Sequence, residues 1–147
     1  MDGETDAHAC RRGWIAVSNQ LLKCTGSRSS FSTENVINME QIFYGCSLLK
    51  SIDMSSFKTP NVTNVCNMFN MCYALTSLDL SNFDTSKVTN MNWTFSNLRS
   101  LKTLTLGENF AFYGTVHGLT GTWVNSAREE FDAKEIPGNV ADTYTKI

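Results

Sequence analysis

The chain repeats itself every 26 residues, and this periodicity constrains the fold more than any other feature. Three successive units share one register without an insertion, beginning at Val36, Val62 and Val88. The shared columns include Asn38, Asn64 and Asn90, then Phe43, Phe69 and Phe95, then Leu49, Leu75 and Leu101. Such a period is typical of stacked units, each too small to bury its own apolar face. We therefore expect Phe43, Phe69 and Phe95 to align along one axis.

The first half of each unit has the apolar spacing of a helix with one buried face. In the middle unit this stripe consists of Val62, Val65, Met68, Phe69 and Cys72. A threonine precedes each stripe, at positions 33, 59 and 85, and Pro60 follows the second of them. This pattern fits a threonine N-cap with proline in the first helical turn.

The second half of each unit predicts a short strand. Its L-x-x-L-x-L pattern is clearest at Leu75, Leu78 and Leu80, and the final alternation indicates one buried face. Helix and strand together predict an α/β fold: a leucine-rich-repeat-like solenoid of short parallel strands alternating with short helices. We expect about three full repeats, a degenerate N-terminal unit and a C-terminal β cap.

The domain limits follow from where the pattern holds. We predict a tail at 1–11, the solenoid at 12–106 with units at about 12–31, 32–57, 58–83 and 84–106, and the cap at 107–147. Within the cap, residues 118–124 and 142–147 are predicted as strands, separated by a polar stretch. The recurring asparagines are expected to satisfy backbone groups at the turns of each unit.

Charge and composition exclude several function classes. The formal net charge is −2, which gives no bulk attraction to nucleic acid or anionic lipid. No apolar run is long enough to insert into a membrane, and no secretory signal peptide is predicted. Five cysteines without a C-x-x-C motif predict neither a disulfide framework nor a zinc site, and Cys46 and Cys72 are expected to be buried.

No catalytic residue, metal ligand or cofactor is predicted. The two histidines, His8 and His117, lie far apart in sequence, so a His–Cys or His–Ser arrangement is not expected. Asp53 and Asp79 occupy one column of the predicted strands. They are interpreted as solvated surface acids, with a weak cation site as the alternative.

A ligand-binding surface is predicted on the outward face of the strands. Its residues are Lys50, Ser51, Asp53, Thr76, Ser77, Asp79, Lys102, Thr103 and Thr105. Trp93 stands where the other units carry Gln41 and Asn67 and is added to this set. An exposed tryptophan favours a contact role, and packing against the cap is the alternative.

The segment from Leu75 to Met91, together with the Met68–Cys72 run, resembles the BspA-like leucine-rich-repeat surface proteins. The resemblance extends over roughly residues 31–147, including the closing segments at 121–125 and 136–145. It implies an extracellular or cell-surface protein that adheres to host matrix proteins, host cells or other bacteria. The resemblance carries over no catalytic residues.

These observations favour a non-catalytic module for adhesion or protein–protein binding. The partner is expected to be a protein, such as a host matrix or cell-surface protein. The alternative is a structural spacer within a larger surface protein, without a ligand of its own. An enzyme is the least favoured class, because a filled stack of repeats leaves no evident room for a deep polar pocket.

Overall fold

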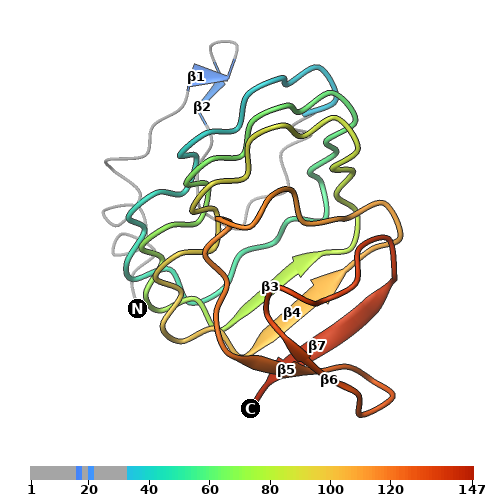
Figure 1. Ribbon diagram of the computed structural model, residues 1–147. Coiled ribbons are helices and arrows are strands. Elements are labelled where there is room, and N and C mark those ends of the chain that lie inside the picture. The colour runs from blue at the N-terminus through green and yellow to red at the C-terminus, as the bar shows by residue number, and fades with distance from the viewer. Residues whose placement is uncertain (1–15, 18–19, 22–32) are drawn as a thin grey trace.

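The computed structural model describes residues 16–17, 20–21 and 33–147, and these residues form strands and turns without a helix (Figure 1). Two short strands, β1 (Ala16–Val17) and β2 (Gln20–Leu21), pair antiparallel. The other strands form one mixed sheet in the order β3-β4-β7-β5-β6. Their bounds are β3 Ser77–Leu80, β4 Thr103–Leu106, β5 Thr122–Val124, β6 Glu130–Asp132 and β7 Asp142–Lys146.

The predicted α/β leucine-rich-repeat solenoid is therefore wrong. In the described part of the chain no helix alternates with the strands, and the fold is all-β. The stretch predicted as a helix is a run of turns. In the middle unit five N–H groups, those of residues 62, 68, 70, 72 and 75, donate to the C=O three residues earlier at 3.1–3.2 Å. Successive turns place apolar side chains on one side at steps of three and four, which mimics the helical spacing.

Two backbone positions in every unit prevent a continuous helix. One column holds Gln41, Asn67 and Trp93 with φ of 59°, 56° and 56°, and the next holds Gly45, Met71 and Asn97 with φ of 72°, 65° and 61°. A residue in this left-handed region ends a right-handed helix. The N–H groups then point to the next unit, as when Asn67 donates to Asn92 O at 2.9 Å.

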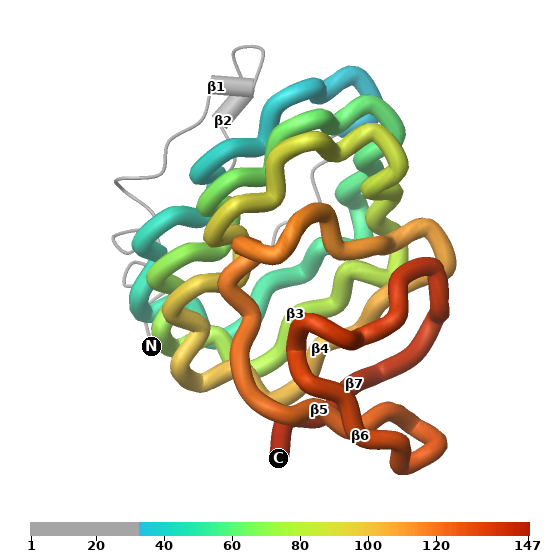
Figure 2. The backbone as a smooth tube through the Cα atoms, viewed as in Figure 1, coloured from blue at the N-terminus to red at the C-terminus, as the bar shows by residue number. Residues whose placement is uncertain are grey.

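The units lie on one another as three similar coils (Figure 2). The ring of Phe69 lies between those of Phe43 and Phe95, with centroid separations of 5.5 and 6.3 Å, and all three rings are buried. The expected alignment of these rings is confirmed. Cys46 and Cys72 are also buried, as predicted. The units are thus held together by one continuous apolar column.

The asparagine column has the predicted structural role. The side-chain oxygens of Asn38, Asn64 and Asn90 each accept the backbone N–H two residues later, at 2.8, 2.9 and 3.2 Å. Backbone bridges also join Asn38 to Asn64 and Asn64 to Asn90. The amides therefore fix the same turn in each coil and keep the coils in register.

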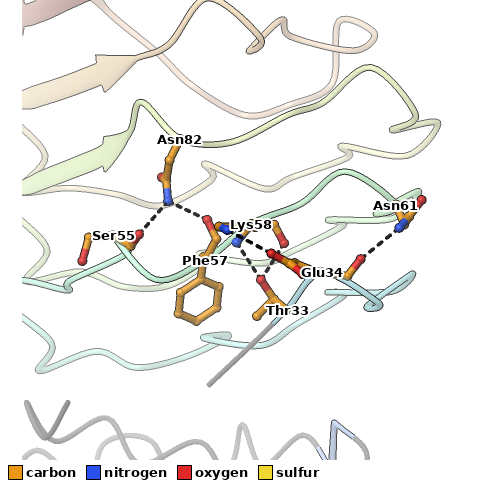
Figure 3. A network of polar contacts seen from close by, with 7 residues as sticks. All are labelled: Thr33, Glu34, Ser55, Phe57, Lys58, Asn61 and Asn82. Atoms are coloured by element: carbon orange, nitrogen blue, oxygen red, sulfur yellow. Dashed lines mark hydrogen bonds and ion pairs between the residues drawn. The ribbon is translucent and has the colours of Figure 1, made fainter. Parts of the chain in front are cut away.

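The threonine column has a different role from the predicted helix caps. The buried hydroxyl of Thr33 donates to the C=O of Lys58 and accepts its N–H, so it bridges two coils (Figure 3). In the same region Asn82 donates to the carbonyls of Ser55 and Phe57. These side chains supply hydrogen bonds to backbone groups that the turns leave unpaired.

The sheet contains two of the three predicted parallel strands. β3 and β4 pair in parallel with Leu78 opposite Leu104, whereas the corresponding residues 49–54 of the first unit form no strand. The remaining strands add antiparallel: β7 pairs with β4 and with β5, and β5 pairs with β6. β6 lies in the polar stretch where no strand was predicted. Trp123 and Tyr144 are fully buried in this part of the core.

Some predictions fall on residues that the structure does not describe. They concern the tail at 1–11 and, apart from the backbone of β1 and β2, the degenerate unit at 12–31. Cys10, Cys24 and His8 lie in the same part of the chain.

Candidate functional site

The exposed face of the sheet carries two rows of small polar side chains that cross β3, β4 and β7. Strand register places Ser77 beside Thr103 and Thr103 beside Thr145 in one row. It places Asp79 beside Thr105 and Thr105 beside Thr143 in the other. The residues that alternate with them along the strands are buried in the core: Leu78, Leu80, Leu104, Leu106 and Tyr144. We use the name hydroxyl face for the six polar residues of the two rows: Ser77, Asp79, Thr103, Thr105, Thr143 and Thr145.

Four of the predicted site residues belong to the hydroxyl face: Ser77, Asp79, Thr103 and Thr105. Thr143 and Thr145 were not included in the predicted surface. The sequence places β7 in the C-terminal cap and does not show that it lies beside β4. Their signal was the alternation in Asp142 to Lys146, which predicts one exposed and one buried side of a strand. The hydroxyls of Thr105 and Thr143 lie 3.1 Å apart and form a hydrogen bond.

The two aspartates of the predicted surface have a local structural role. The Asp79 carboxylate accepts the N–H of Ser81 at 2.9 Å, and that of Asp53 accepts the N–H of Ser55 at 2.9 Å. Each carboxylate therefore stabilises the turn that follows it, and for Asp79 this turn follows β3. In the part of the chain that the structure describes, no group of three or more metal-ligating side chains occurs.

Three further predicted residues form a separate row at the start of the strands. Thr76 donates its N–H to Lys50 O at 3.1 Å, and Lys102 donates its N–H to Thr76 O at 2.9 Å. Lys146 continues the row by donating its N–H to Lys102 O at 2.8 Å. Thr76 also directs its hydroxyl to Lys50 O at 3.2 Å. This row precedes the hydroxyl face by one residue on β3 and β4.

The last two predicted residues lie outside both rows of the face. Ser51 is exposed on a segment without strand structure. Trp93 is half exposed, and its backbone N–H donates to Val116 O at 2.7 Å. Trp93 lies in a turn with a left-handed φ of 56°, outside β4.

The titratable groups of the interior serve packing. Burial lowers the pKa of His117, whose Nδ1 accepts the N–H of Leu119 at 3.3 Å and whose ring lies 4.6 Å from that of Phe112. Burial raises the pKa of the Cys66 thiol, to which Asn67 donates a hydrogen bond. A thiol reacts as its thiolate, so the raised pKa makes Cys66 less reactive near neutral pH.

The described residues thus define an all-β domain of stacked 26-residue units that presents a polar sheet face. The chain belongs to the family described as "Mycoplasma protein of unknown function, DUF285", which matches residues 16–110. The matched span contains the three repeats and ends before β5. No curated protein and no solved structure matches the chain. The family's description differs from the BspA-like label, so that resemblance remains a prediction. No membrane-spanning helix is found in the part described.

Proposed function

We propose that this chain is a non-catalytic binding module that acts at the cell surface and contacts a protein partner through the hydroxyl face. The observation that carries the proposal is the pair of polar rows formed by three adjacent strands. Nothing in the core requires these positions to be polar, because their side chains point away from it. Surface location rests on the resemblance to the BspA-like proteins.

The chemistry of the face suits adhesion. Threonine and serine hydroxyls both donate and accept hydrogen bonds, and their short side chains lose little conformational entropy on binding. The strands hold them at about 4.8 Å between neighbours and about 6.7 Å along each strand. A face of this size is smaller than a standard interface of about 800 Å² per partner. Each contact is therefore expected to be weak, and strong adhesion would come from several modules acting together.

The test measures binding of the purified full chain to immobilised collagen, fibronectin and laminin by surface plasmon resonance. Thr105→Arg with Thr143→Arg places two bulky cations in the centre of the face. Asn92→Arg with Thr115→Arg adds the same charge at exposed positions off the sheet. We expect the first pair to weaken binding to the recognised matrix protein at least about tenfold, and the second to leave it unchanged.

Two results would contradict the proposal. In one, the chain binds a matrix protein and both double variants bind it equally well, so another surface is responsible. In the other, the chain binds none of the three proteins even when it is displayed at high density on beads. That second result would favour the spacer, which needs the buried columns but tolerates substitution of the threonines on the hydroxyl face.

A further inference from the structure

A basic rim lies at the corner where the coils turn into the strands. We use this name for Lys50, Arg99, Lys102 and Lys146. Backbone hydrogen bonds connect Lys50 to Thr76, Thr76 to Lys102 and Lys102 to Lys146, so three lysines lie in one row across neighbouring segments. Lys50, Arg99 and Lys102 are exposed, and Lys146 is half-buried.

The rim is separated from the acidic groups of the chain. Residues 44–52, 70–78, 96–104 and 143–147 contain no aspartate or glutamate, although the whole chain has 14 acidic and 12 basic residues. Among the residues that the structure describes, no ion pair involves a rim cation, and the pair that is present joins Lys58 to Glu34. Asp53 and Asp79 lie three residues, or about 10 Å of extended backbone, beyond Lys50 and Thr76, and each carboxylate accepts a backbone N–H of a turn. On the other side of the rim, Glu130 and Asp132 flank Phe131 on β6, two strands away from Lys146.

Lys102, which directly precedes β4, and Lys146 of β7 are neighbours with the same charge. Their backbones are joined by a hydrogen bond of 2.8 Å, and like charges in such a position destabilise a sheet. The Nζ of Lys146 lies 5.8 Å from the ring centroid of Trp123, a contact that accommodates one cation but leaves Lys102 without a counter-charge in the described residues. An anionic partner would neutralise both.

Apolar and aromatic groups stand beside these cations. Leu48 is 59% exposed two residues before Lys50. Arg99 lies over the ring of Tyr73 at 4.6 Å, and Tyr73 is three residues before Thr76. A sulfated polysaccharide would use the cations alone, whereas an acidic polypeptide can also place apolar side chains on Leu48 and Tyr73. The mixture therefore favours a peptide.

We infer that the basic rim binds an extended acidic polypeptide segment of a partner protein, with its carboxylates along the row of lysines. The segment crosses from the first unit to β7. The inference does not depend on the hydroxyl face, since different side chains carry it. Arg99 fits a carboxylate as a two-pronged donor, and the lysines act as point charges.

The experiment measures fluorescence anisotropy of a labelled synthetic peptide of glutamates with interspersed leucines, titrated with the full chain at low salt. The test variant is Lys50→Gln, Lys102→Gln and Lys146→Gln together. The matched control is Lys87→Gln, Arg128→Gln and Lys134→Gln, which removes the same charge elsewhere. We expect the rim variant to lose about tenfold or more in affinity and the control to lose less than about twofold. Added salt should weaken binding of the unaltered chain more than that of the rim variant.

Three controls make the result decisive. Circular dichroism and melting temperature show that each variant folds. The double variant Thr105→Arg with Thr143→Arg should still bind the peptide, which separates this site from the hydroxyl face. Equal losses in the rim and control variants, or no binding by the unaltered chain, would overturn the inference. Heparin that binds the rim at least about tenfold more tightly than the peptide would overturn the choice of a polypeptide.

Discussion

The hydroxyl of Thr59 bonds to both backbone polar groups of Asp84: it donates to the C=O at 2.9 Å and accepts the N–H at 2.8 Å. Thr59 is buried, and no helix begins there. Thr59→Val keeps the shape of the side chain but leaves both backbone groups without this partner. We expect a loss of about 1–3 kcal/mol in the free energy of unfolding, measured by urea denaturation.

Thr59→Ser is the matched control for this change, because it keeps the hydroxyl and removes a methyl group. It should cost about 1 kcal/mol or less. If valine were tolerated as well as serine, the hydroxyl would not be what joins the second and third coils.

The aromatic column predicts a strong effect at its centre. Phe69 is fully buried between two other phenylalanine rings, so Phe69→Ala creates a cavity in the middle of the stack. We expect the free energy of unfolding to fall by about 3–5 kcal/mol. Tyr113→Ala, at a half-exposed aromatic, should change it by less than about 0.5 kcal/mol. If the two substitutions lowered the melting temperature equally, the stacked phenylalanine rings would not be a main source of stability.

Gly107 predicts a steric limit between the second and third coils. A Cβ at this position would lie 1.9 Å from the backbone oxygen of Ser81, which cannot move without disturbing β3. Gly107→Ala should therefore destabilise the chain by about 1–3 kcal/mol through overpacking. The control is Gly114→Asn, since a Cβ there meets nothing within 4 Å and asparagine tolerates its φ of 71°. If Gly107→Ala left the free energy of unfolding unchanged in chemical denaturation, the backbones would be less closely packed at this point.

His117 predicts a pH dependence of stability. Burial, and secondarily the charge of Lys134, lowers its pKa below the ordinary 6.5. The unfolded chain therefore takes up a proton near pH 6.5 while the folded chain still resists it. The free energy of unfolding should fall as the pH drops through this window and should not depend on His117 above it.

The measurement compares urea unfolding of the unaltered chain and His117→Asn at about pH 7.5 and about pH 5. Asparagine can still accept the Leu119 N–H but does not titrate in this range. His8 is present in both proteins, so the difference between their pH slopes isolates His117. Identical slopes would mean that His117 is protonated equally in the folded and unfolded chain.

The repeat and its buried columns could be predicted from the sequence, because buried positions carry apolar residues of similar size in every unit. Positions such as Phe43, Phe69 and Phe95 must stay apolar and similar in size for neighbouring coils to fit. The asparagine column was equally readable, because an amide in the same place in three units indicates one recurring turn. These inferences need only the spacing of residues, not the backbone conformation between them.

The backbone conformation could not be read from the same spacing. Turns and helices both bring apolar side chains together at steps of three and four, and the distinction lies in φ at Asn67 and Met71. Asparagine at such a position is a weak hint of a left-handed residue, but methionine and tryptophan give none. Tertiary hydrogen bonds between coils, which sequence patterns do not display, determine the result.

The candidate site was predicted in part for a related reason. Alternation along one strand identified Ser77 and Thr103 as outward-facing, since this depends on local geometry alone. The contribution of Thr143 and Thr145 depends on which strand lies beside β4, and that neighbour comes from the other end of the chain. Pairing of distant segments leaves no local signal, so two of the four threonines of the hydroxyl face were not predicted.

The offset of 26 residues between hydrogen-bonded partners also limits how such a chain can change in length. Both Thr63 with Ile37 and Thr89 with Thr63 obey it, so gain or loss of one or two residues within a coil would mispair every contact on either side. A duplicated unit of 26 residues could instead form the same hydrogen bonds with the coils on both sides of it. One extra residue before Phe110 separates Thr85 from its partner Ala111 by 26 residues, in place of the 25 that separate Thr59 from Asp84. The closing strands that follow accommodate this residue. Growth of this architecture by entire coils, rather than by drift in loop length, is the evolutionary route that its hydrogen bonding leaves open.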